Sequence, residues 1–424
     1  MAAAPAHRDR LGLALTAAGG EAARALDDAV WAYVGFSREP GVPLKRALQA
    51  DPAMPMANIL QGYFMHLMGQ PHLVPAARAA HAIAAKTPMT PREQAHLAAL
   101  GAWCDGELER AAVVLDAVLA EHPRDYLALK IANYLYFYLG DAANVRDGPA
   151  RALEHWDEGL PGYGHLLALH AFGLEESGDY AAAERQGRRA TELNPADPWA
   201  VHAVAHVMEM QDRAAEGVRW IGEHAPACEG TNFFRHHLWW HLALMHWDEG
   251  RIEDALRLYD ERVWAEGSSE NLSLCNDISM LARLELAGAE VGDRWRSAAE
   301  VVREQSGGGI LAFVDAHYAL ATGAPPRGEA RGATARVNDT VGRALCDAVV
   351  AWRSGGHARV VRLLQPVLGE LWRIGGSHAQ RDLFTLLLVD AARRSGNDAL
   401  ARDLLGARNR AVPPYFAFGT RPIR

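Results

Sequence analysis

The stretch PWAVHAVAHVMEMQ, residues 198–211, carries three side chains that could do chemistry. His202 and His206 lie four residues apart, and Glu209 follows three residues later. On a helix these spacings place all three side chains on one face. Imidazole can act near neutral pH as a general base, a metal ligand or a hydrogen-bond partner, so the row predicts either a ligand site or an internal polar network.

A second stretch, FFRHHLWWHLALMHWDEG (233–250), repeats the four-residue spacing with His237 and His241. Two such pairs on neighbouring helices would suit zinc or another borderline metal. The stretch lacks the glutamate placement of an HExxH motif, so we assign no metal ligand and leave the cofactor unknown. If the site is catalytic, we expect His206 or His241 to act as base and Glu209 to orient it.

A third stretch, FVDAHYA (313–319), contains Asp315 and His317. Residues two apart diverge by about 200° on a helix, so these two side chains cannot pair directly. One reading places one of them in a pocket. The alternative is a helix-capping aspartate beside a packed histidine.

A fourth stretch, GGSHAQRDLF (375–384), predicts a helix that begins after Ser377. Exposed N–H groups in its first turn, together with Arg381, would suit a carboxylate or phosphate. The alternative is that Arg381 forms a salt bridge to Glu209 or Asp315. The full set of predicted substrate-binding residues is His202, His237, Trp199, Trp240, Asp315, His317, His378, Gln380 and Arg381.

The elements that carry these residues should all be helices. Nearly every segment is rich in Ala and Leu with apolar residues at three-to-four spacing, and alternating Val/Ile/Thr runs are absent. Gly106, Gly178 and Gly250 begin three similar stretches that lie 72 residues apart, close to twice the tetratricopeptide length of about 34 residues. We therefore predict an all-α tetratricopeptide-like superhelix of helical hairpins, able to close around a central pocket.

Within this array we expect three parts. Residues 1–318 form the main helical array, and the Gly/Pro/Ala-rich residues 319–340 form a loop. Residues 341–424 form C-terminal helical repeats that pack back on the array, ending in a non-helical tail at 411–424. SGGGI (306–310) lacks a nucleotide-loop frame and is expected to be a turn.

Composition excludes several classes of partner. The net charge of −9 with dispersed basic residues argues against binding to nucleic acid or an anionic membrane. No stretch is long enough to span a bilayer, and we read no signal peptide. The four cysteines, Cys104, Cys228, Cys275 and Cys346, are far apart without a CxxC, as expected for reduced, buried thiols in a cytoplasmic protein.

The chain resembles the tetratricopeptide repeat protein 38 family over essentially its whole length. The resemblance implies an all-helical, strongly curved repeat fold but brings no defined activity. The family tends to have Asn where Leu238 stands and Asp where Asn276 stands, so specificity could differ here. The stretches that carry the resemblance are MTPREQAHLAAL (89–100), AFGLEESGDYAAAE (171–184), NPADPWAVHAVAHVMEMQDR (194–213), WWHLAL (239–244), ALRLYD (255–260), FVDAHYALA (313–321) and GGSHAQRDLF (375–384).

Three functions remain open from the sequence. The first is a binding protein whose inner pocket holds a small anionic molecule or a peptide. The second is an enzyme that uses the same histidines for acid–base or metal-assisted hydrolytic chemistry. The third is a protein–protein scaffold whose polar residues only hold the repeats together. Homo-oligomer formation is compatible with all three.

Overall fold

The computed structural model describes residues 7–264, 270–305 and 308–408. They form two compact units, which are described separately. Unit 1 ends at Ala200 and also includes Gly230–Asn232, and unit 2 comprises Val201–Glu229 and the chain from Phe233 onward. This division falls inside a helix, α11 (Pro198–Met210), whereas the sequence suggested a boundary near residue 318.

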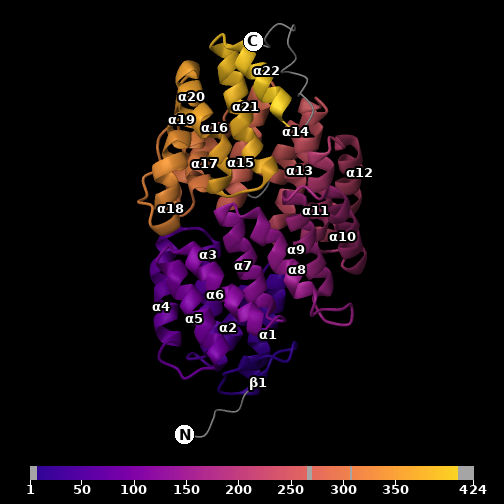
Figure 1. Ribbon diagram of the computed structural model, residues 1–424, viewed down its shortest axis with the longest axis vertical. Helices are drawn as coiled ribbons and strands as arrows, with labels where there is room; N and C mark the ends of the chain where they lie inside the picture. The colour runs from indigo at the N-terminus through magenta and orange to yellow at the C-terminus, as the bar shows by residue number, and fades with distance from the viewer. Residues whose placement is uncertain (1–6, 265–269, 306–307, 409–424) are drawn as a thin grey trace. The chain divides into compact units, whose positions relative to one another are not determined.

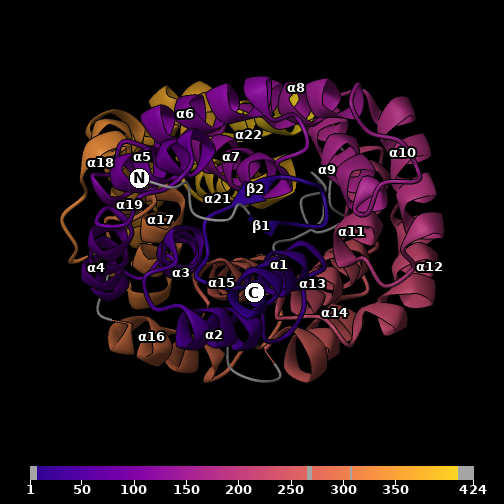
Figure 2. The ribbon, with the colours of Figure 1, turned by 90° about the horizontal axis from the view of Figure 1, so that it is seen from below.

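Unit 1 consists of a short hairpin and a series of antiparallel helices (Figure 1). The hairpin pairs β1 with β2, His7 opposite Leu15. Neighbouring helices in the sequence, such as α5 with α6 and α9 with α10, pack side by side (Figure 2). The elements are β1 His7–Arg8, β2 Ala14–Leu15, α1 Gly20–Val34, α2 Gly41–Ala50, α3 Pro55–Leu67, η1 Pro71–Leu73, α4 Val74–Ala84, α5 Pro91–Cys104, α6 Leu108–Glu121, α7 Tyr126–Leu139, α8 Ala142–Leu153, α9 Tyr163–Glu176 and α10 Tyr180–Leu193.

Unit 2 continues with helical hairpins, broken by short 3-10 and π turns. In it α21 packs against α15, and α19 packs against α17. The elements are α12 Ala214–His224, η2 Ala225–Cys228, α13 Phe234–Asp248, α14 Ile252–Leu258, η3 Tyr259–Val263, α15 Asn271–Leu286, α16 Arg294–Glu304, α17 Ala312–Thr322, α18 Gly332–Val337, η4 Asn338–Gly342, α19 Arg343–Arg353, α20 His357–Leu364, η5 Gln365–Ile374, α21 His378–Arg394 and α22 Asp398–Ala407.

The prediction of an all-α fold of repeated helical hairpins is confirmed. Gly106, Gly178 and Gly250 each follow the first helix of a hairpin with φ of 79°, 83° and 74°. This left-handed conformation ends a helix at little cost for glycine. Gly140 lies 34 residues after Gly106, and Asp212 lies 34 residues after Gly178, both also with positive φ. Each 72-residue unit of the sequence is therefore two hairpins.

Small buried residues let the helices of a hairpin approach closely. In α6 these are Ala111 and Ala112, and in α10 they are Ala183, Gly187 and Ala190. The second helix of the hairpin α7–α8 begins at an aspartate N-cap: Asp141 before α8 accepts from Asn144 N at 3.0 Å.

The predicted loop at 319–340 is too long. Helix α17 continues to Thr322, and α18 occupies Gly332–Val337. Buried Ala333 and Thr334 anchor this short helix, and Thr334 Oγ1 donates to Ile310 O at 2.7 Å. Gly and Pro composition alone did not reveal that contact. The tail at 411–424 and the first residues of SGGGI lie outside the described residues.

Two expectations about the chain's chemistry can be checked directly. All four cysteines are buried free thiols, as predicted. Among the described helices, none is both long and apolar enough to cross a bilayer.

Candidate functional site: a four-histidine cluster

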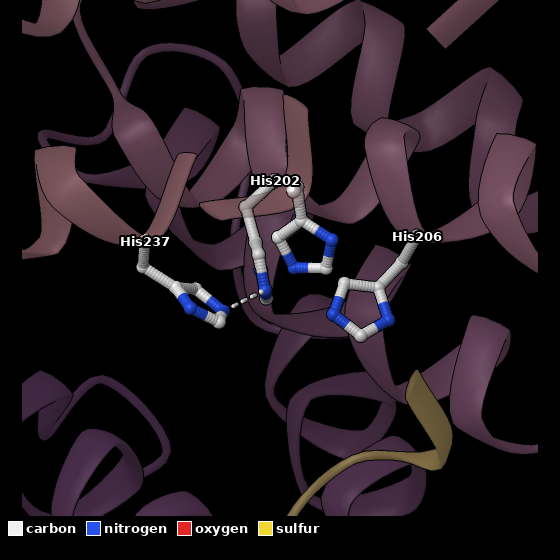
Figure 3. Close-up of side chains that lie close together, drawn as sticks. His202, His206 and His237 are labelled. Atoms are coloured by element: carbon white, nitrogen blue, oxygen red, sulfur yellow. Dashed lines mark hydrogen bonds between the residues drawn. The ribbon is translucent and has the colours of Figure 1, made fainter. Parts of the chain in front are cut away.

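The histidine pairs of α11 and α13 come together in unit 2. Their side chains are buried, with exposed fractions of 2% for His202, 0% for His206, 8% for His237 and 0% for His241. One ring nitrogen from each of the four lies within 4.8 Å of the others. Figure 3 shows His202, His206 and His237 turned toward one another. The i,i+4 spacing on each helix accounts for this arrangement, because it stacks both rings of a pair on one face.

The four rings form a tight group. The ring centroids of His202 and His206 are 4.3 Å apart, and those of His206 and His241 are 4.5 Å apart. His237 Nε2 lies 3.0 Å from His202 Nε2, the contact dashed in Figure 3. Burial, and next the nearby imidazoles, lower the pKa of His202 and His237 well below the ordinary value. These two rings are therefore neutral at pH 7.

Glu209 positions His241 from behind. His241 Nδ1 lies 2.8 Å from Glu209 Oε2, and both side chains are fully buried. An ionised carboxylate only accepts hydrogen bonds, so Nδ1 carries the proton. The lone pair of His241 then lies on Nε2. This is the arrangement in which a carboxylate fixes the tautomer of a metal-binding or basic histidine.

A chain of amide groups positions His237, and its direction can be traced from a backbone donor. Ser377 N donates to Gln380 Oε1 at 3.0 Å, as part of the capping box that starts α21. Gln380 Nε2 must then donate to Asn276 Oδ1 at 3.0 Å, which turns Asn276 Nδ2 toward His237 Nδ1 at 2.9 Å. We call Ser377, Gln380 and Asn276 the amide relay.

The amide relay determines the tautomer of His237. Because Asn276 Nδ2 donates, His237 Nδ1 must accept, and the single proton of the neutral ring lies on Nε2. That N–H then donates to His202 Nε2, whose lone pair accepts it. The cluster therefore presents lone pairs from His202 and His241 and one N–H from His237.

Aromatic rings enclose the cluster. Trp240 is fully buried and stacks on His237 with centroids 5.2 Å apart and planes at 11°. Phe234 contacts His202 and His237 at 5.2 and 5.1 Å. Apolar walls of this kind lower the local dielectric constant and so strengthen electrostatic interactions inside the cluster.

Two predicted site residues of α17 lie in other surroundings. Asp315 Oδ1 accepts from Gly309 N at 2.7 Å, and burial raises the pKa of Asp315 to about 6 despite that hydrogen bond. His317 Nδ1 donates to Phe313 O at 2.8 Å, and its ring packs on Phe384. Burial lowers the pKa of His317 to about 4. Asp315 lies within the first turn of α17 and does not cap it, because the N-cap is Leu311 without a side-chain hydrogen bond.

Of the remaining predicted site residues, Gln380 belongs to the amide relay, and the other three have surroundings of their own. His378, beside Gln380, is exposed. Arg381 Nη1 donates to the carbonyls of Gly375 and Gly376, at the turn before α21. Trp199 belongs to unit 1, where it packs on Phe172 with centroids 5.1 Å apart.

Sequence reasoning missed two features of unit 2. Asn276 was noted as a departure from a family pattern, but its role in holding His237 was not foreseen. Arg283, fully buried on α15, donates through Nη1 to Ser279 Oγ at 2.7 Å and through Nη2 to Ala379 O at 2.8 Å. Its guanidinium lies 5.7 Å from the Trp240 ring centroid. A lone arginine in an apolar helix was the available signal.

Unit 1 contains a second buried network that the sequence did not reveal. Arg92 Nη1 and His96 Nε2 lie 2.6 and 2.9 Å from Asp125 Oδ2, and Tyr63 Oη lies 3.3 Å from His96 Nδ1. Burial alone would raise the pKa of Asp125, but His96 and Arg92 outweigh it and hold that pKa well below the usual range. The motif PREQAH carried the signal, an Arg and a His four residues apart on one helix.

Comparison with known proteins adds little to this picture. No family model matches the chain. Among solved structures, the crystal structure of the TPR domain of P58(IPK) is similar, with 10% sequence identity over 67% of this chain and 83% of that one and a TM-score of 0.23. At that identity and TM-score, nothing about activity or ligands transfers, and the site stands on its own geometry.

Proposed function

We propose that this protein is a helical-repeat binding protein and that the four-histidine cluster is its ligand site. The observation that carries this proposal is the convergence of four buried imidazoles within 4.8 Å. Burying so many polar rings costs free energy, and apolar side chains of similar size would pack the same helices without that cost. Binding of a ligand by the cluster would explain why this cost is maintained.

The ligand we propose is a small anion. The rings are at most 8% exposed, so a peptide backbone has little access to them. The Nε2–H of His237, which donates to His202 Nε2 in the cluster, can donate instead to a carboxylate or phosphate oxygen. The imidazoles supply no positive charge while they are neutral, so this donor acts through a hydrogen bond alone. Membership of the tetratricopeptide repeat protein 38 family and a cytoplasmic location belong to the same proposal.

Calorimetric titration of the purified protein with inorganic phosphate and with acetate tests this function. We expect 1:1 binding of at least one probe, weakened about 10- to 100-fold in His237→Ala, because the hydrogen bond from its Nε2–H to a charged group is lost. His155→Ala, an exposed histidine, is the matched control. Circular dichroism establishes that the variants fold. If neither probe binds, or if the folded His237→Ala variant binds with the wild-type affinity, the proposal is overturned.

A second candidate function is hydrolysis with His241 as general base. The 2.8 Å contact between Glu209 and His241 Nδ1 favours it, because that contact leaves Nε2 as the basic nitrogen. Release of nitrophenolate from p-nitrophenyl phosphate or p-nitrophenyl acetate is the measurement. We expect His241→Ala to lower the rate about 10²- to 10⁴-fold, and a rate equal to that of wild type would exclude this role.

A further inference from the structure

We infer that the four-histidine cluster is a binding site for a divalent transition metal, with His202, His206 and His241 as ligands and His237 as a hydrogen-bond donor to whatever fills the fourth position. This inference deepens the proposed function and rests on it for the anion, but the metal can be tested without any anion.

The donor atoms have the chemistry and spacing that such an ion requires. Imidazole nitrogen suits Zn²⁺, Cu²⁺, Ni²⁺ and Fe²⁺. Zinc–nitrogen bonds of about 2.0–2.1 Å in a tetrahedron place the nitrogens roughly 3.4 Å apart. One nitrogen from each ring already lies within 4.8 Å of the others, so small side-chain rotations suffice.

The groups behind the rings define which nitrogens can coordinate. Glu209 holds the proton of His241 on Nδ1, which leaves Nε2 to coordinate. His202 Nε2 accepts a hydrogen bond in the metal-free protein, so its lone pair also points into the cluster. Carboxylates in this position are a recurrent feature of metal-binding histidines.

His237 differs from the other three because of the amide relay. Its Nδ1 accepts from Asn276, so its Nε2 carries a proton and offers no lone pair. Reversing that tautomer would turn all the amides and leave Ser377 N–H facing a donor instead of Gln380 Oε1. Three histidine ligands with an open fourth position are the usual arrangement of a zinc site that binds an exogenous ligand.

Metal binding then requires an exchange of one hydrogen bond and no loss of a proton from the cluster. The lone pair of His202 Nε2 passes from the His237 N–H to the metal, and that N–H becomes available to an anion on the metal. A divalent cation held by three imidazoles adds positive charge to the cluster. This charge strengthens the binding of an anion beyond what a hydrogen bond alone provides.

Titration of the chelator-treated full-length protein with Zn²⁺ and Co²⁺ alone tests the inference. We expect one ion per chain, with the visible absorption of tetrahedral Co²⁺. The affinity should fall on the order of a hundredfold in His206→Ala and in His241→Ala, because a ligand is lost. His206→Gln provides a second variant if the alanine forms fail to fold, and His155→Ala is the control. Wild-type affinity no greater than that of these folded variants would overturn the inference.

His237→Ala tests the division of roles. We expect it to keep most of the Co²⁺ affinity but to lose phosphate affinity for the metal-loaded protein. A loss of Co²⁺ affinity as large as that of His206→Ala would overturn the assignment of His237 as donor. Co²⁺ binding without phosphate or acetate binding would support the metal site and refute the anion, whereas anion binding without Co²⁺ binding would do the reverse.

Discussion

Each unit of the molecule buries a histidine network, and the two networks differ in what the imidazoles face. In unit 1, His96 has protein partners on both ring nitrogens, Asp125 on Nε2 and Tyr63 on Nδ1. The charge of Asp125 is matched by Arg92. In unit 2, the imidazoles face one another, and their carboxylate and amide partners lie behind them.

This difference separates a structural network from a ligand site. A network whose donors, acceptors and charges are matched within the protein gains nothing from a further ligand. A group of rings whose coordinating nitrogens converge is better stabilised when an ion lies between them. Both networks are buried and both contain histidine, so neither property alone identifies a functional site.

The largest effect should come from breaking the charge match in unit 1. Asp125→Ala leaves the Arg92 guanidinium buried without its carboxylate, and we expect it to lower the free energy of unfolding by about 3–5 kcal/mol. Chemical denaturation provides the measurement. Asp141→Ala is the control, because Asp141 also caps a helix but takes part in no ion pair among the described residues, and it should cost about 1 kcal/mol. Equal losses in the two variants would show that the pairing contributes nothing.

A smaller effect in unit 1 concerns pH. Lys130 donates to the carbonyls of Tyr33 and Val34 at 3.1 and 3.0 Å, and burial lowers its pKa to about 7. Between about pH 7 and the ordinary lysine pKa the unfolded chain binds the proton and the folded chain does not, so stability rises with pH. The loss of folding free energy caused by burying the charged Lys130 is complete below about pH 7 and disappears as the pH approaches 10.5.

Lys130→Met should remove this rise of the free energy of unfolding with pH. Across the two pH units from about 7.5 to 9.5 we expect the wild-type free energy of unfolding to gain roughly 2–3 kcal/mol relative to the variant. Paired denaturation curves at several pH values measure the difference, in which contributions shared by both proteins cancel. Parallel pH profiles would mean that the folded protein keeps the lysine charged.

Local sequence patterns predicted the helices and the position of the histidines on them. The i,i+4 spacing was enough to place His202 with His206 and His237 with His241. The partners that set the tautomers could not be read in this way, because Asn276 and Gln380 are joined across 104 residues. The hairpin turn at Asp212 was missed for a simpler reason. Such turns are usually recognised by a glycine, but here an aspartate takes the left-handed conformation.

In unit 2, loss of the carboxylate behind His241 should weaken the metal without removing a ligand. Glu209→Gln keeps the shape and an acceptor for His241 Nδ1–H but removes the charge, so we expect Co²⁺ affinity to fall about 10- to 100-fold. Competition with a chelator of known affinity provides the measurement. Glu216→Gln, in a surface ion pair with Arg213, should leave the affinity unchanged. A loss shared by both variants would reflect net charge alone.

The smallest expected change in affinity concerns the amide relay, and its sign is opposite for the two ligands. In Asn276→Asp, one carboxylate oxygen accepts from Gln380 Nε2 and the other accepts from His237 Nδ1, so the proton of His237 moves to Nδ1. Its Nε2 lone pair becomes a fourth metal ligand, and the N–H that held the anion is lost. We expect Co²⁺ to bind up to about tenfold more tightly and phosphate more weakly.

Added negative charge alone would also tighten Co²⁺ binding and weaken phosphate binding, so a second variant is needed to separate the causes. Gln380→Leu adds no charge, yet it releases Asn276 to turn its carbonyl toward His237 Nδ1. If the tautomer is what matters, Gln380→Leu changes both affinities in the same directions as Asn276→Asp, though less. If only charge matters, Gln380→Leu leaves both affinities at the wild-type values, and the relay then has no part in dividing the four histidines into three ligands and one donor.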